Sequence, residues 1–183
     1  MPFQFKETPI SGVIHISSKR FEDKRGFFME LFKLDEMKAL GISQFVQGNM
    51  SFSKKGIIRG LHYQINPFPQ GKLVTVSKGS IADVAVDIRK GSPTFGKYVM
   101  YILNPGEMLW IPPGFAHGFQ ALEESYVIYF ITHSKFSPQH ERCIKWNDDE
   151  IGIKWPLKEE ILSDKDMSCP PLSLAENNFI YSG

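Results

Sequence analysis

The chain of 183 residues is long enough for one domain that buries roughly 70% of the surface exposed by the unfolded chain, so we expect a single domain over residues 1–183. Its net charge of +1 argues against a protein that coats nucleic acid or a membrane, since such proteins carry a pronounced basic bias. The first residues lack the apolar core of a signal peptide and no apolar run could span a bilayer, which predicts a cytoplasmic protein.

Glycines and prolines recur at short intervals along the whole chain, a pattern typical of many short strands joined by turns. One early stretch has helical spacing instead. Leu34, Met37 and Leu40 follow one another at intervals of three residues, and Gly41 comes next as a residue that ends helices. We therefore expect one short peripheral helix over residues 34–40.

The clearest strand covers residues 81–89, where apolar Ala82, Val84 and Val86 alternate with Asp83 and Asp87. Alternation with period two predicts a strand with one buried and one exposed face. Four other segments behave similarly, namely 72–77, 97–103, 108–111 and 125–132. Strands joined by tight turns pair antiparallel, and a closed form leaves no exposed edge. The sequence thus predicts an all-β fold, a jelly-roll β-barrel with short peripheral helices.

The stretch from Ile57 to Gln64 places an arginine, a glycine and a histidine in an otherwise apolar, strand-like run. A histidine that titrates near neutral pH, beside a permanently charged arginine, suits proton transfer on an anionic substrate. Strict alternation would send Arg59 and His62 to opposite faces of the strand. We therefore expect a bulge at Gly60 that changes the phase. Taken singly, a histidine on a strand is usually a core or surface residue without a catalytic role.

Three further groups would complete a site for proton abstraction next to a carbonyl: a cation, an acid and a carboxylate that orients His62. Lys72 and Tyr129 are candidates for the first two, and Tyr129 is in phase with Val127 and Ile131, which points it toward the interior. Spacing alone pairs none of these residues. Taken singly, Lys72 has the pattern of a solvated lysine and Tyr129 that of a core residue.

The sequence gives no sign of a metal or an organic cofactor. His62 is followed by Tyr63 and Gln64, so the HxH pair that holds a divalent metal ion in some small β-barrels is missing, and no P-loop or GxGxxG motif opens a helix. Cys143 and Cys169 have no CxxC spacing. We expect plain thiols, and the sequence leaves open whether the two ever meet.

Nine segments in order along the chain carry a common signature. They are 23–28 (DKRGFF), 45–49 (FVQGN), 58–64 (IRGLHYQ), 72–74 (KLV), 83–89 (DVAVDIR), 111–119 (IPPGFAHGF), 141–148 (ERCIKWND), 153–156 (IKWP) and 162–166 (LSDKD). Together they resemble the dTDP-4-dehydrorhamnose 3,5-epimerase family over nearly the whole chain. The resemblance implies a cupin-type jelly roll, a homodimer, and catalysis without metal or organic cofactor.

The activity that the resemblance implies is inversion at C3 and C5 of dTDP-4-dehydro-6-deoxy-D-glucose, which gives dTDP-4-dehydro-L-rhamnose. The 4-keto group acidifies the hydrogens on both flanking carbons, so one site would invert both centres through an enolate. By resemblance His62 is the base, Lys72 stabilises the enolate oxygen and Tyr129 is the acid on the opposite face. Asp166 would orient His62, with Asp164 as the rival for that role.

The substrate's diphosphate calls for planar, bidentate donors, for which Arg25 and Arg59 are the best candidates, and Phe27 would form part of the base-binding wall. The resemblance adds further substrate-binding positions at Glu30, Gln47, Asn49, His117 and Glu141. For His117 the alternative is a plain turn histidine.

Two positions depart from the family pattern: Met50 stands where many members have histidine, and Phe136 where many have a second tyrosine. Both lie apart from the expected base and acid, so they bear on the balance between inversion at C3 and at C5. Two alternatives therefore stay open. One is a single-centre epimerase for another nucleotide-linked deoxysugar, and the other is a cupin that binds a sugar nucleotide without catalysis.

Overall fold

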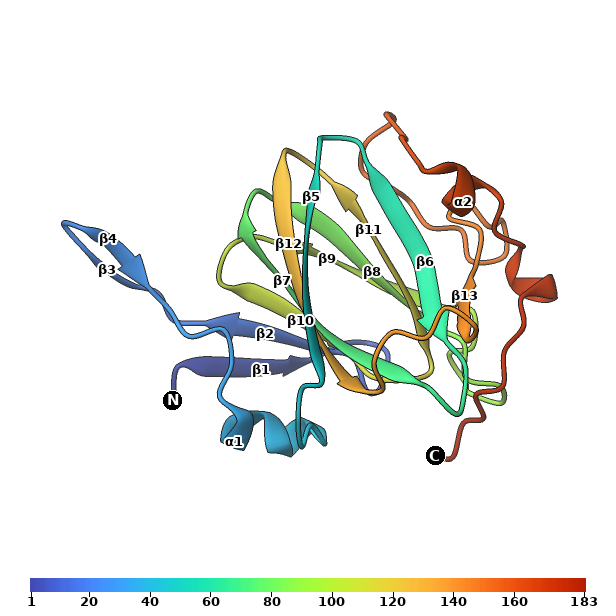
Figure 1. Ribbon diagram of the computed structural model, residues 1–183, viewed down its shortest axis with the longest axis horizontal. Helices are drawn as coiled ribbons and strands as arrows, with labels where there is room; N and C mark the ends of the chain where they lie inside the picture. Colours follow the sequence, from blue (N-terminus) through green and yellow to red (C-terminus); the bar gives the residue numbers. More distant parts are fainter.

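The computed structural model describes residues 1–183 and contains two antiparallel sheets packed face to face (Figure 1). The larger sheet has six strands in the order β1 (Phe3–Glu7), β2 (Ile14–Ser18), β10 (Glu107–Ile111), β7 (Gln70–Lys78), β12 (Ser125–His133) and β5 (Gln47–Ser53). The smaller has five in the order β13 (Glu141–Cys143), β6 (Ile58–Gln64), β11 (Phe115–Ala121), β8 (Ile81–Asp87) and β9 (Tyr98–Leu103). None of the short helices is long and apolar enough to cross a membrane.

The prediction of an all-β jelly roll with peripheral helices is confirmed, and each predicted strand overlaps an observed one, although β8 ends two residues before the predicted 81–89 and β9 begins one residue after the predicted 97–103. The two sheets nevertheless do not close into a continuous barrel. Strands β1, β5, β9 and β13 each lie at a sheet edge with one hydrogen-bonded neighbour. The sandwich is held together by side chains instead, because Val74 and Leu109 of the larger sheet pack with Ala85 and Phe119 of the smaller one.

Strand β8 differs from its predicted half-exposed form, since all seven of its residues are buried. Its inner face joins the core between the sheets. On its outer face Val84 and Val86 pack against Ile151, Leu172 and Phe179 of the C-terminal segment, which covers this side of the smaller sheet. The prediction of a solvent-exposed face was therefore wrong, because alternation separates two faces without indicating what covers each of them.

The predicted helix is confirmed as α1 (Leu34–Met37), which continues into a 3₁₀ turn, η1 (Lys38–Leu40). Gly41 ends it in the left-handed conformation with φ of 78°, a region where glycine has no steric penalty. Met37 is buried with Ile16 and Leu73. The helix therefore covers the outer face of the larger sheet.

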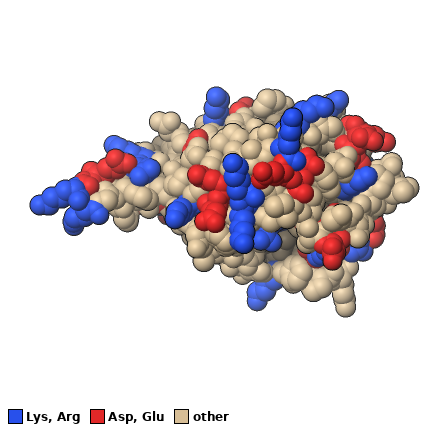
Figure 2. Space-filling model, turned by 90° about the horizontal axis from the view of Figure 1, so that it is seen from above, with Lys and Arg blue, Asp and Glu red and all other residues tan.

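A two-stranded hairpin, β3 (Phe21–Asp23) and β4 (Gly26–Phe28), projects away from both sheets (Figure 1). Its phenylalanines are exposed, with Phe28 at 65%, and positively charged side chains gather at its tip (Figure 2). Large apolar side chains on a projecting element usually mark a surface that another molecule covers. The sequence pattern did not predict this projection.

Strand β6 contains the expected bulge. His62 pairs with His117 of β11 and Arg59 with Phe119, so three steps along β6 face two along β11. The backbones are so close here that a Cβ on Gly60 would lie 2.6 Å from the Cα of Gly118. The bulge therefore changes the phase of the strand, and only glycine fits at this approach.

Cys143, at the end of β13, and Cys169, which follows α2 (Asp164–Met167), form a disulfide with Cα atoms 5.5 Å apart. The expectation of plain thiols was wrong. Contact between residues 26 apart depends on the path of the chain after β13, which residue spacing does not indicate.

Candidate active site

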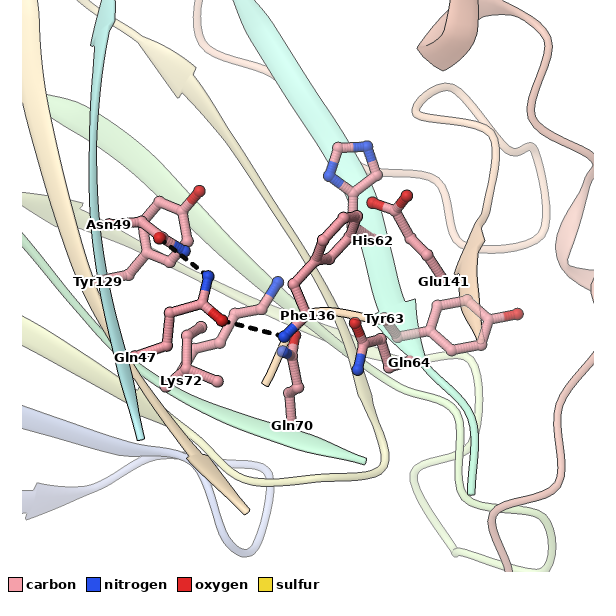
Figure 3. Close-up of a pocket in the computed structure, with 11 residues that line it drawn as sticks. Gln47, Asn49, His62, Tyr63, Gln64, Gln70, Lys72, Tyr129, Phe136 and Glu141 are labelled. Carbon is pink, nitrogen blue, oxygen red and sulfur yellow. Dashed lines mark hydrogen bonds between the residues drawn. The ribbon is translucent and has the colours of Figure 1, made fainter. Parts of the chain in front are cut away.

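A pocket of about 270 Å³ opens between the two sheets (Figure 3). Strands β5, β7 and β12 form one wall, and β6 and β13 form the other. Its lining residues are Gln47, Asn49, His62, Tyr63, Gln64, Gln70, Lys72, Tyr129, Ile131, Phe136 and Glu141. Most of these side chains are polar, which suits a hydrophilic ligand such as a sugar.

His62 projects into this pocket from β6, and its Nε2 lies 2.6 Å from Oδ1 of Asp166. The second carboxylate oxygen of Asp166 accepts a hydrogen bond of 3.2 Å from the backbone N–H of Gly60. Burial acts to raise the pKa of Asp166, but the hydrogen bonds from His62 and Gly60 and the charge of His62 hold it below its ordinary value. An ionised carboxylate is thus fixed against one ring nitrogen, which leaves the other to exchange a proton.

Of the two aspartates considered for this contact, Asp166 makes it. Ser163 caps α2 by accepting a hydrogen bond of 3.1 Å from the backbone N–H of Asp166, and the turn points that side chain inward. Asp164 is exposed, and its carboxylate has no hydrogen bond or ion pair.

Lys72 and Tyr129 lie on the wall opposite His62 (Figure 3). The Lys72 Nζ is 6.0 Å from the centroid of the Tyr129 ring. Desolvation lowers the pKa of Lys72 to about 8, against the attraction of Asp83 and Glu141. Burial raises the pKa of Tyr129, with Arg59 and Asn49 acting in the opposite direction, so its phenol keeps its proton near neutral pH.

Behind the pocket lies a second imidazole–carboxylate pair that the sequence did not reveal. His117 Nε2 is 2.6 Å from Oδ1 of Asp83, both side chains are buried, and Oδ2 of Asp83 has no hydrogen-bond partner. Burial lowers the pKa of His117 and raises that of Asp83, while Lys72 acts on Asp83 in the opposite direction. Asp83 lies on the face of 81–89 that we expected to be exposed. The one sequence signal for a functional role of Asp83 was its position at the start of segment 83–89, which is part of the family signature.

Four of the expected substrate-binding residues lie at or beside the pocket. Gln47 and Asn49 line it and are joined by a hydrogen bond of 3.0 Å, and Glu141 lines it while pairing with Lys165 at 2.6 Å. Arg59 lies outside the lining, where its Nε donates to Ser53 Oγ at 2.9 Å. It is still close enough to act on the pKa of Tyr129.

Arg25, Phe27 and Glu30 are not brought to the pocket by this chain. Arg25 and Phe27 lie on the projecting hairpin, where the Arg25 side chain is 84% exposed and paired with Asp23. Glu30 follows the hairpin and pairs with Lys33 at 3.3 Å. A single chain therefore leaves the pocket without three of the residues expected to bind the substrate.

Two glutamines that we did not single out shape the rim of the pocket. Gln64 accepts a hydrogen bond of 2.8 Å from Ser137 N–H, and Gln70 donates one of 3.0 Å to the Ser134 carbonyl. Gln47 accepts one of 3.0 Å from the backbone N–H of Phe136. These bonds fix the loop that carries Phe136 over the pocket. Isolated glutamines on strands give no sequence signal for such a role.

The fold and the pocket define a cupin-type jelly roll with an imidazole–carboxylate pair on one wall and an ammonium and a phenol on the other. A family model described as dTDP-4-dehydrorhamnose 3,5-epimerase matches residues 7–173. The chain belongs to this family, which confirms the resemblance seen in the sequence.

Individual relatives agree over most of the chain. A dTDP-4-dehydrorhamnose 3,5-epimerase from Shigella flexneri is 48% identical over 166 residues, which cover 88% of this chain and 92% of the relative. A dTDP-4-dehydrorhamnose 3,5-epimerase from Sulfolobus tokodaii, known from its crystal structure, is 59% identical in sequence. The match covers 96% of this chain and 98% of the other, with a TM-score of 0.91. A 3,5-epimerase from Legionella pneumophila, 43% identical with 94% of each chain covered and a TM-score of 0.90, was solved with dTDP-4-keto-L-rhamnose.

Proposed function

We propose that this protein inverts C3 and C5 of dTDP-4-dehydro-6-deoxy-D-glucose to give dTDP-4-dehydro-L-rhamnose, a step in dTDP-L-rhamnose biosynthesis. The observation that carries the proposal is the placement of His62, held by Asp166, across one pocket from Tyr129 and Lys72. Membership of the family supports the substrate.

In the proposed reaction His62 is the base. It removes the proton from C3 or C5, and Asp166 stabilises the imidazolium that forms. The electron pair moves into the 4-keto group, and the Lys72 ammonium lies on the wall where it would stabilise the enolate oxygen. Tyr129 then donates its phenolic proton to the opposite face of the carbon. Each inversion leaves His62 protonated and Tyr129 deprotonated, and proton exchange with water then restores both groups for the next inversion.

The buried His117–Asp83 pair, which lies behind the pocket, would stabilise the positive charge of Lys72. Asp83 attracts the Lys72 ammonium and opposes the lowering of its pKa by desolvation. We assign His117 the role of holding Asp83 in place beneath the sugar site, because its side chain is only 8% exposed. Gln47 and Asn49 line the same pocket and would donate hydrogen bonds to the sugar and diphosphate, whereas Glu141 would accept them from sugar hydroxyls. Arg59 lies nearby.

We further propose a homodimer in which the hairpin of one copy enters the pocket region of the other. Two observations support this arrangement. First, Arg25 and Phe27 lie on a hairpin that projects away from the pocket of their own chain (Figure 1). Second, the exposed phenylalanines of this hairpin form an apolar surface of the kind that a partner usually buries. A partner's hairpin would supply the guanidinium and the aromatic ring that a nucleoside diphosphate requires.

The cytoplasmic location stays a prediction from the sequence, as does the lack of nucleic-acid and membrane partners. The Cys143–Cys169 disulfide bears on the cytoplasmic location. Disulfides persist mainly in oxidising compartments or in intracellular proteins of hyperthermophiles. Thiol labelling of protein taken directly from its source cells would show whether the bridge forms there.

Isotope exchange tests the proposed activity. Incubation with dTDP-4-dehydro-6-deoxy-D-glucose in deuterium oxide should place deuterium at both C3 and C5, as detected by NMR of the sugar. Deuterium at one carbon only would replace the proposal by a single-centre epimerase. Binding without any exchange would leave a sugar-nucleotide-binding cupin.

A further inference from the structure

The contact between His62 and Asp166 joins parts of the chain that are 104 residues apart. Asp166 lies on α2, which has only four residues. The backbone around it is anchored on one side by the bond from Ile58 N–H to the Ile161 carbonyl, 2.9 Å, and on the other by the bond from Lys145 N–H to the Pro170 carbonyl, 2.8 Å. Between these anchors the segment is held to the body of the protein through side chains.

The disulfide is the one covalent link between this segment and the sheet that carries His62. Cys143 is the register partner of His62 on the neighbouring strand. Cys169 is buried, and its backbone N–H donates to the Asp166 carbonyl at 3.4 Å. The bridge therefore connects the position opposite His62 to the turn that carries Asp166.

The noncovalent contacts in this region are weaker constraints. The ion pair between Lys165 and Glu141 joins the same two elements, but the Lys165 side chain is largely exposed, and exposed pairs contribute little. The hydrogen bond from Gly60 N–H is made to the Asp166 carboxylate itself. It therefore depends on the carboxylate being in position and does not anchor the surrounding backbone. The disulfide is thus the strongest constraint on where the carboxylate stands.

We propose that the Cys143–Cys169 disulfide is a positioning element of the active site, which holds the Asp166 carboxylate against the His62 imidazole. This inference rests on the proposed function, in which His62 is the base. A displacement of about 1 Å in a catalytic group can cost about 100-fold in rate. Loss of the bridge should therefore lower kcat about 10- to 100-fold and leave KM within about twofold, because the residues that line the pocket stay in place.

A double-mutant cycle separates positioning from general stabilisation. The first variant carries Cys143→Ser and Cys169→Ser, the second Asp166→Asn, and the third all three changes. If the bridge acts through Asp166, removing it should cost about 10-fold or more in the parent but less than about twofold in the Asp166→Asn background. Equal losses in both backgrounds would overturn the proposal.

A control variant completes the experiment. Leu103→Ala, a substitution in the core of β9 away from the pocket, should lower the melting temperature and leave kcat within about twofold of the parent. The cysteine-free variant should instead lose kcat with little change in KM. A loss of kcat in Leu103→Ala as large as that in the cysteine-free variant would count against positioning.

Where the serine variants fail to fold, the native protein serves instead. Dithiothreitol transfers two electrons and two protons to the bridge, which gives two thiols and the cyclic disulfide of the reagent. The rate should fall on reduction and recover on reoxidation, and mass spectrometry after alkylation counts the thiols. A reduced protein with full activity would reject the inference.

Failure of the proposed function can be distinguished from failure of the positioning role of the disulfide. A parent protein that exchanges no deuterium at C3 or C5 contradicts the epimerase, and the positioning claim is then read from the ¹⁵N NMR signals of the His62 ring without substrate. Those signals should change when the bridge is removed. If they do not, the disulfide has no influence on the contact.

Discussion

His62 and His117 are paired across strands β6 and β11, and the Nε2 of each lies 2.6 Å from a carboxylate oxygen, that of Asp166 and that of Asp83. The two pairs differ in their access to solvent. The His62 side chain is 28% exposed and opens into the pocket, whereas that of His117 is 8% exposed. Only the first pair can exchange protons with a ligand, so we assign the second an electrostatic role.

Replacing Asp166 should remove the partner of His62. We expect Asp166→Asn to lower kcat by about 10²–10⁴-fold with little change in KM, because the amide cannot stabilise a positive imidazolium. Asp164→Asn is the matched control, since Asp164 is exposed and has no side-chain partner. Steady-state kinetics on both variants measure the difference. Similar losses in the two would contradict the assignment of Asp166.

Replacing Tyr129 should separate exchange from inversion. Tyr129→Phe keeps the ring but lacks the phenolic proton, and burial keeps that phenol protonated in the native protein. His62 should then still remove a proton and return a deuteron to the same face. We expect exchange into the substrate to continue while inversion falls by about 10²-fold or more. NMR of the recovered sugar distinguishes the two, and unimpaired inversion would exclude Tyr129 as the acid.

The charge on Lys72 should set the alkaline limb of the pH profile. Its pKa of about 8 means that the ammonium is present below this value and is lost as pH rises through it. We expect kcat to fall above about pH 8 in the parent and the limb to be absent from a slow Lys72→Met variant. The ordinary pKa of lysine, 10.5, applies to Lys72 in the unfolded chain. Between about pH 8 and 10.5 the unfolded chain therefore binds more protons than the folded protein, so the cost of burying Lys72 declines as pH rises through this range.

The proposed exchange of hairpins predicts complementation between two inactive proteins. In a dimer of His62→Asn and Arg25→Ala subunits, one of the two sites would combine an intact His62 with an intact Arg25 from the partner. After unfolding and refolding of an equal mixture, about a quarter of the parent activity should return, given random pairing. If each hairpin serves its own chain, the mixture should show no recovery.

The close approach of β6 and β11 predicts a steric effect at Gly118. A Cβ there would lie 2.7 Å from the Arg59 carbonyl oxygen, and backbone cannot move aside cheaply. We expect Gly118→Ala to lower the free energy of unfolding by about 1–3 kcal/mol. Gly48→Ala is the control, because its Cβ would make only ordinary contact with Phe130, at 3.6 Å. Denaturant titration measures both, and equal stabilities would argue against the tight approach.

Local patterns predicted what depends on neighbours in sequence. Alternation located β8, threefold spacing located α1, and the position of Gly60 between Arg59 and His62 indicated the bulge. These features follow from the geometry of a single strand or helix, which residue order determines directly.

What the sequence did not indicate depends on the path of the whole chain. Burial of Asp83 requires both the sheet opposite it and its partner His117, and the disulfide requires the segment after β13 to return beside it. The projection of the hairpin likewise depends on what the rest of the fold leaves uncovered. The family resemblance named residues for the site but could not show that Arg25 and Phe27 stand apart from the pocket of their own chain.

The C-terminal segment that covers β8 also delivers Asp166, and this has a consequence during translation. A nascent chain that ends before this segment leaves Val84 and Val86 open to water and His62 without its carboxylate. Because this segment leaves the ribosome after the strands of both sheets, the protein gains a protected sheet and a competent base together, once the segment has been synthesised. A prematurely terminated product would therefore be an aggregation-prone fragment rather than a slow enzyme.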